Sequence, residues 1–166
     1  MIILGIDPGL NVTGYGAIAA AGRRLQLLAA GDVRPPRGKP IAERLGYLHA
    51  ALSELIQRQR PDTIVLEMVF THQDYVSTAA LMAHARGVAC LAAQQQGVPL
   101  AEYPTARVKK AIAGRGGAGK EQVARMVAQW IGARDAGWSH DATDALALAI
   151  AHAHMQGQGR LAAVRG

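Results

Sequence analysis

Acidic residues stand at three points where an apolar segment of the sequence begins or ends. Asp7 closes the first apolar run of the chain, and Glu67 closes a second. Asp141 and Asp144 open a long apolar segment, and residues three apart lie on the same side of a helix. A carboxylate at the end of a buried segment is costly unless a cation or hydrogen bonds compensate its charge. The four acids are therefore candidates for one common site.

Each acid also has a simpler interpretation. Asp7 precedes Pro8 and Gly9, and Asp is a common opener of such turns. Acids in the first turn of a helix complement its dipole, which accounts well for Asp141. It accounts less well for Asp144, because the run after Asp144 is almost entirely apolar. A helix this apolar is mostly buried, so Asp144 needs a partner.

Four carboxylates at one site would favour divalent cations, because like charges raise one another's pKa. Oxygen ligands without His or Cys favour Mg²⁺ or Mn²⁺. Two such ions about 3.5–4 Å apart would let water displace a phosphoryl group, one ion activating the water and the other stabilising the leaving oxygen. The formal net charge of +6 favours a polyanionic partner such as nucleic acid. These features together predict a metal-dependent nuclease.

The elements that must position the acids follow from hydrophobic periodicity and from Gly and Pro breakers. Three strands in succession predict an antiparallel meander, and the later strands are joined through helices. The fourth strand can then lie parallel to the first, which brings Asp7 and Glu67 to one edge of a mixed β-sheet flanked by α-helices. The predicted strands are 2–7, 13–18, 25–33, 62–67 and 97–103, and the predicted helices are 41–60, 77–95, 106–113, 120–131 and 140–155.

The composition fits a single α/β domain of 166 residues, because half of the residues are hydrophobic. We expect the domain to span residues 1–155 and a flexible basic tail to span 156–166. Cys90 is the single cysteine, which suits a reducing compartment. The first strand follows Met1 without a basic leader, and the apolar stretch 79–93 is too short for a bilayer. We therefore expect a cytoplasmic protein without a membrane partner.

The segment from Gly114 to Lys120 matches the first part of an NTPase phosphate-binding loop. However, Glu121 stands where Ser or Thr would bind Mg²⁺, and a basic helix precedes the loop in place of a buried strand. ATP binding is rejected for these reasons. We expect this basic loop, which includes Arg115, to contact DNA backbone instead. An actin-like ATPase is also excluded, because that architecture needs two such domains.

Five motifs occur in an order and at spacings that resemble the RuvC family of Holliday junction resolvases, which belongs to the RNase H-like superfamily. They are Ile-Asp-Pro-Gly at 6–9, Thr-Gly-Tyr-Gly at 13–16, Leu-Glu-Met-Val-Phe at 66–70, Ala-Arg-Gly at 85–87 and His-Asp-Ala-Thr-Asp-Ala-Leu-Ala-Leu-Ala at 140–149. The resemblance runs from Met1 to about Met155. It implies an RNase H-like fold and a homodimer that works with the RuvA–RuvB branch-migration complex. It further implies symmetric nicking of two strands of a four-way DNA junction in recombination and repair, leaving 5′-phosphate and 3′-hydroxyl ends.

The resemblance also implies roles for individual residues. It makes the four acids the metal ligands and catalytic residues, and it matches Lys120 and Lys109 to basic residues important for catalysis. Lys110, adjacent to Lys109, is the alternative, and a solvated helix face would explain both. Phe70 matches an aromatic residue placed against DNA, although core packing would also explain it. His140 precedes the third acid and is kept as an auxiliary residue.

Two other functions remain open from the sequence. One is a different RNase H-like nuclease that acts on an RNA–DNA hybrid or on structured RNA. The other is a non-catalytic junction-binding protein, which would not need four acids at one edge. The segments 67–70 and 109–120 carry the details that favour the junction resolvase.

Overall fold

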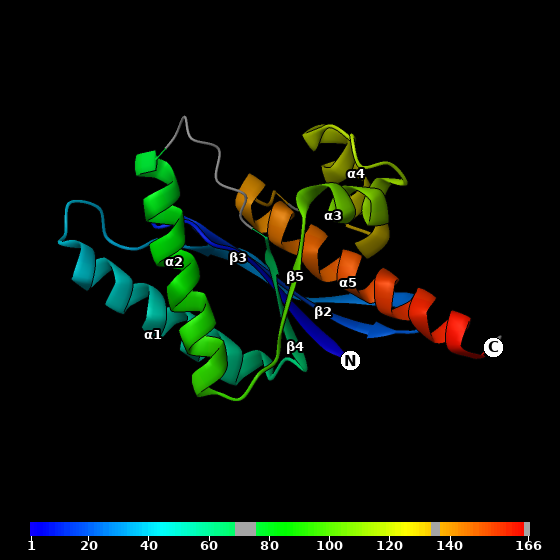
Figure 1. The fold of residues 1–166 in the computed structure, drawn as a ribbon, viewed down its shortest axis with the longest axis horizontal. Helices are drawn as coiled ribbons and strands as arrows, with labels where there is room; N and C mark the ends of the chain where they lie inside the picture. Colours follow the sequence, from blue (N-terminus) through cyan, green and yellow to red (C-terminus); the bar gives the residue numbers. More distant parts are fainter. Residues whose placement is uncertain (69–75, 134–136, 165–166) are drawn as a thin grey trace.

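A five-stranded sheet with helices on both faces makes up the computed structural model, which describes residues 1–68, 76–133 and 137–164 (Figure 1). The strands are β1 (Ile2–Asp7), β2 (Thr13–Ala21), β3 (Arg24–Val33), β4 (Thr63–Glu67) and β5 (Leu100–Tyr103). The helices are α1 (Ile41–Gln59), α2 (Val76–Gln95), α3 (Thr105–Ala113), α4 (Lys120–Ile131) and α5 (His140–Val164). The predicted order of elements is confirmed.

The strand order in the sheet is β3-β2-β1-β4-β5. The strands β1, β2 and β3 form an antiparallel meander, whereas β4 is parallel to β1 and β5 is parallel to β4. Ile6 pairs with Leu66, so the next residues in each strand, Asp7 and Glu67, end at the same edge. The predicted mixed α/β sheet is therefore confirmed.

Each face of the sheet has its own hydrophobic core, because successive side chains of a strand point to opposite faces. Ile3 and Val65 pack toward α3, α4 and α5, whereas Leu4 and Leu66 pack toward α1 and α2. Figure 1 shows the same division, with α1 and α2 on one side of the sheet and α5 on the other. The acids at the ends of β1 and β4 are thus anchored on strands buried from both sides.

Glycines on β1 and β2 let α5 lie directly on the sheet. A Cβ atom built on Gly5 would stand 1.9 Å from the carbonyl oxygen of Ala145. One built on Gly14 would stand 2.1 Å from the carbonyl carbon of Asp141. Any larger residue would push the helix away. Because Gly14 pairs with Asp7, this contact places the first turn of α5 beside the end of β1.

Two helix ends differ from what the local sequence suggests. Thr is a residue type that often caps a helix start, but at the start of α3 Pro104 and not Thr105 occupies the cap position, and no side chain makes a cap hydrogen bond. The last helix was expected to end at about Met155, but α5 continues to Val164. The glycines at 157 and 159 suggested a stop, whereas Arg160–Ala163 are good helix formers that allow it to continue. Flexibility of 156–166 stays a prediction, as does the boundary at 155.

Ser139 caps the start of α5. The backbone N–H of Ala142 donates to Ser139 Oγ at 3.0 Å, as a Ser cap does. In the described part of the chain, no helix combines the length and the apolar character needed to cross a membrane.

Candidate active site

Asp7 lies at the centre of a group of acids at one edge of the sheet. Its pKa is raised from 3.8 to about 7, first by burial and then by the charges of Asp144, Asp141 and Glu67. Lys120 acts in the opposite direction and lowers it. Four residues distant in sequence therefore act electrostatically on one carboxyl group, as expected from the strand ends and the helix start.

Asp144 lies on α5 and shares this environment. Burial is the largest cause of its raised pKa, and Glu67 and Asp141 raise it further. Lys120 and His140 lower it. The predicted acids thus form one cluster in which each negative charge makes another harder to maintain. His140, the first residue of α5, is exposed and adds a positive charge near this cluster when it is protonated.

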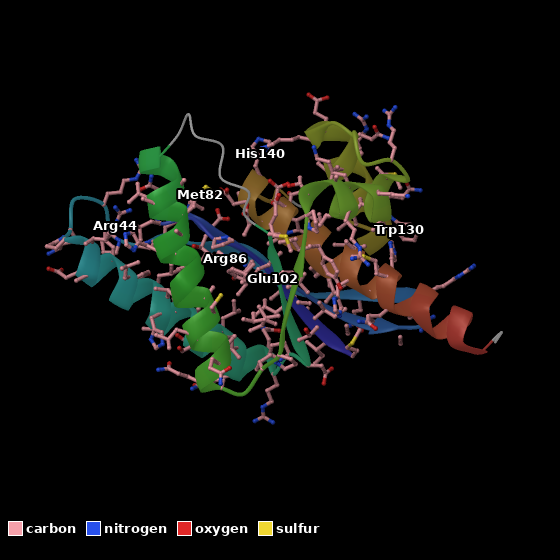
Figure 2. The ribbon with its side chains drawn as sticks, in the orientation of Figure 1. Arg44, Met82, Arg86, Glu102, Trp130 and His140 are labelled. Carbon is pink, nitrogen blue, oxygen red and sulfur yellow. The ribbon has the colours of Figure 1, made fainter. Side chains whose placement is uncertain are left out.

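Glu67 is held at the end of β4 by neighbouring elements. Thr105 Oγ1 donates a hydrogen bond to Glu67 Oε1. The main-chain oxygen of Glu67 accepts a hydrogen bond from Arg86 Nη1 at 2.7 Å. Figure 2 shows Arg86 on α2 directed toward Glu102 on β5, to which its other terminal nitrogen donates.

The first turn of α5 is tied to β3 through Ser139. Its hydroxyl donates to Asp32 Oδ1 at 2.5 Å, and Asp32 also accepts from Arg34 at 2.6 Å. Asp32 pairs in the sheet with Gly14. The sequence analysis did not select Asp32, although it too is an acid near the end of an apolar strand, which is the signal that identified Asp7 and Glu67.

The donor set fits a hard divalent cation. Carboxylates from β1, β4 and α5 meet at one sheet edge, and their mutual repulsion would be relieved by positive charge. Within the described residues, no three Asp, Glu, His or Cys side chains are close enough together to coordinate one ion. This agrees with the raised pKa values of Asp7 and Asp144, because charges act over longer distances than direct coordination does. The acids form an electrostatic cluster whose side chains would have to move inward to bind an ion.

Among the predicted basic residues, Lys120 is the one brought to the acids. It is the first residue of α4, and its charge acts on both Asp7 and Asp144. Lys109 is half-buried and Lys110 exposed on α3, and neither affects those two pKa values. Arg115 is exposed and donates to Gln122 Oε1 at 2.7 Å. Phe70 lies outside the described residues.

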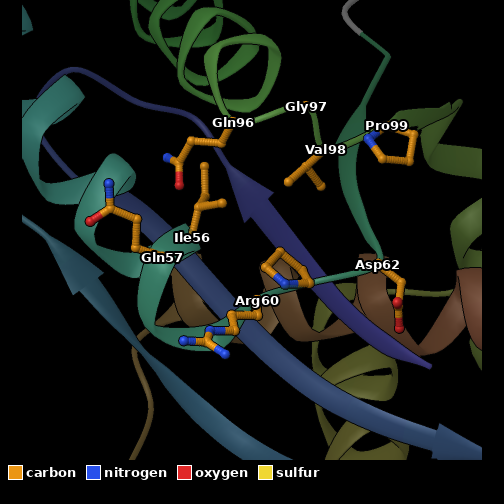
Figure 3. Close-up of a pocket in the computed structure, with 9 residues that line it drawn as sticks. Ile56, Gln57, Arg60, Asp62, Gln96, Gly97, Val98 and Pro99 are labelled. Carbon is orange, nitrogen blue, oxygen red and sulfur yellow. The ribbon is translucent and has the colours of Figure 1, made fainter.

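A shallow pocket occurs at the opposite end of the sheet (Figure 3). The pocket lies beside Asp62, just before the start of β4, whereas Glu67 of the acid cluster lies at the other end of that strand. The lining residues are Ile56, Gln57, Arg60, Pro61, Asp62 and 96–99. None of the clustered acids lines this pocket, so it is separate from the candidate site.

A three-stranded meander extended by two parallel strands, with helices on both faces, is the RNase H-like fold. The yeast mitochondrial Holliday junction resolvase shares the fold, with a TM-score of 0.69 at 10% identity over 94% of this chain and 80% of that one. The family model for crossover junction endodeoxyribonuclease RuvC matches residues 3–152. The chain therefore belongs to the RuvC family.

Individual RuvC proteins match this chain along almost its whole length. The RuvC of Halorhodospira halophila is 48% identical over 164 residues, covering 99% of this chain and 96% of that protein. The RuvC of Pelotomaculum thermopropionicum is 44% identical, covering 93% of each. The Thermus thermophilus RuvC solved in complex with Holliday junction substrate has a TM-score of 0.89 and 35% identity, covering 96% of each chain. RuvC proteins are metal-dependent hydrolytic nucleases, so the predicted enzyme class is confirmed.

Proposed function

We propose that this chain resolves Holliday junctions with a two-ion Mg²⁺ or Mn²⁺ site formed by Asp7, Glu67, Asp141 and Asp144. The observation that carries the proposal is the convergence of these acids from three elements beside one lysine, Lys120. A protein that merely bound junctions would gain nothing from holding a buried carboxyl whose pKa is raised to about 7. Phosphodiester hydrolysis explains that cost.

Two bound divalent ions would supply activation of the attacking water and stabilisation of the leaving 3′-oxygen. The protein contributes the placement of their ligands. Asp7 ends the central strand of the sheet, which lies between β2 and β4. Lys120 adds a positive charge next to Asp7 and Asp144, where it would offset negative charge that develops on the phosphate.

Membership of the RuvC family supports the proposed substrate and assembly. A Thermus thermophilus relative was solved with Holliday junction substrate, and the net charge of +6 suits a DNA partner. We propose a homodimer that nicks two symmetry-related strands and leaves 5′-phosphate and 3′-hydroxyl ends, because a two-fold junction suits a two-fold enzyme. We further propose a cytoplasmic location and cooperation with RuvA–RuvB. DNA contacts are proposed for Phe70, Lys109 or Lys110, Arg115 and Lys120.

A cleavage assay tests the proposal. The protein is incubated with a synthetic four-way junction, a linear duplex and an RNA–DNA hybrid, each with Mg²⁺, Mn²⁺ or chelator. We expect paired, metal-dependent nicks in the junction and no cleavage by the Asp7→Asn variant. Cleavage of the hybrid alone would favour the other type of RNase H-like nuclease. Junction binding without cleavage in every metal condition would overturn the nuclease proposal.

A further inference from the structure

Thr105 does not perform the role that its position suggests. It is the first residue of α3, where a Thr hydroxyl often satisfies free N–H groups of the helix. In this chain Pro104 precedes it as the cap residue, and α3 has no side-chain cap hydrogen bond. The Thr105 hydroxyl instead donates to Glu67 Oε1 across the end of the sheet. The contact joins α3 to a proposed metal ligand.

The other contacts that hold Glu67 in place involve its backbone. Arg86 donates to the Glu67 main-chain oxygen and to the Glu102 carboxylate. It therefore fixes the end of β4 without neutralising the Glu67 side chain. In the sheet, Glu67 also pairs with Tyr103, two residues before Thr105. Among the described residues, Thr105 is the recorded hydrogen-bond donor to the Glu67 carboxylate.

One hydrogen bond to one carboxylate oxygen has a definite consequence. Oε1 accepts the hydrogen bond from the hydroxyl, which leaves Oε2 as the oxygen available to a cation, and the charge of Glu67 acts on both Asp7 and Asp144. A neutral hydroxyl does this without adding a positive charge that would compete with a cation. An Arg or Lys in its place would form an ion pair with the carboxylate and weaken cation binding.

We propose that Thr105 is a positioning residue that orients Glu67 to bind a divalent ion through a single oxygen. The inference rests on the proposed metal-dependent function and deepens it. Hydrogen-bonding partners of metal ligands fix the orientation of those ligands, and their loss typically lowers metal affinity by about 10–100-fold. Thr105 itself need not touch the ion or the DNA.

The test uses three variants of the full chain. Thr105→Val removes the hydroxyl at nearly constant shape, and Thr105→Ser keeps it. Thr63→Val is the matched control, because Thr63 lies at the other end of β4 and donates to the Pro99 carbonyl at 3.2 Å. That carbonyl also accepts from the backbone of Ile64, so it stays hydrogen-bonded in the control. Thr105 is exposed, which allows its replacement without disturbing the core.

Mn²⁺ binding to the DNA-free protein is measured by titration calorimetry, and junction cleavage is measured as a function of Mn²⁺ concentration. We expect Thr105→Val to weaken Mn²⁺ binding by about 10-fold or more. We also expect its cleavage to need correspondingly more Mn²⁺ and to recover at saturation. Thr105→Ser and Thr63→Val should bind like the unaltered protein. A Thr105→Ala variant serves in the same way if Thr105→Val fails to fold.

Three outcomes overturn the inference, and they distinguish its failure from failure of the proposed function. If the unaltered protein binds Mn²⁺ and cuts the junction, and Thr105→Val binds Mn²⁺ equally well, Thr105 has no positioning role while the proposed function stands. The same holds if Thr63→Val weakens binding as much as Thr105→Val. If the unaltered protein neither binds Mn²⁺ nor cuts the junction, the proposed function fails and the inference fails with it.

Discussion

Replacing Asp7 by Asn should stabilise the metal-free protein while abolishing its activity. The folded state raises the pKa of Asp7 from 3.8 to about 7, so it binds this proton more tightly than the unfolded chain does. The stabilisation is complete below pH 4 and is lost as the pH rises through 7. A difference of about three pKa units corresponds to roughly 4 kcal/mol. Asn is neutral at every pH, so the variant does not lose this stabilisation as the pH rises.

The expected gain for Asp7→Asn without metal is about 2–4 kcal/mol at pH 8, and close to zero at pH 4. The lower figure applies if Asp144 and the other acids relax apart. For a chain of this size, that gain raises Tm by roughly 5–15 °C. Mn²⁺ should stabilise the unaltered protein at pH 8 and have little effect on the variant, because only the unaltered site carries the Asp7 charge that the cation relieves.

The measurement is thermal and urea unfolding from pH 4 to 8, with chelator and then with Mn²⁺. Glu54→Gln is the control, because the Glu54 side chain is 72% exposed and its ion-pair partner among the described residues is Arg58 on the same helix face. Its stability should change by less than about 0.5 kcal/mol at any pH. If Asp7→Asn is no more stable than the unaltered protein at pH 8, burial and the neighbouring acids do not raise the pKa of Asp7 as the structure indicates.

Three further substitutions and one control variant test the elements around the acids. Lys120→Ala should slow junction cleavage by about 10²–10³-fold in single-turnover assays. It should also extend the loss of metal-free stability to higher pH, because the lysine lowers the pKa of Asp7 and its removal raises that pKa further. Gly14→Ala should cost at least about 1–3 kcal/mol in urea unfolding, whereas Gly87→Ala on α2, with nothing within 4 Å, should gain up to about 1 kcal/mol. Ser139→Ala should cost about 1 kcal/mol through the lost cap, measured by thermal unfolding.

The acids were predictable because their positions follow from local patterns. An apolar run that ends in a carboxylate marks a buried strand, and parallel pairing brings Asp7 and Glu67 to one edge. The spacing of Asp141 and Asp144 marks one side of a helix. The close approach of α5 to the sheet depends on Gly5 of β1 and on Gly14 and Gly16 of β2.

The contacts that orient the acids were not predictable in the same way. Thr105 and Asp32 meet their partners across 38 and 107 residues of sequence, and no periodicity connects such positions. Thr105 even carried a misleading local signal, since Thr at a helix start suggests a cap. Pro104 already occupies the cap position, which leaves the hydroxyl free to reach Glu67.

The difference between predictable and unpredictable residues has a physical origin. A metal ligand of this type must be a carboxylate on a rigid element, so its chemistry and its strand leave a pattern in the sequence. A residue that orients the ligand needs only one suitable donor at the right place, and Thr105 on α3 and Arg86 on α2 provide such donors to Glu67. Many sequences can satisfy that requirement. The orientation of the acids is therefore where members of one family with the same four acids can differ in metal affinity.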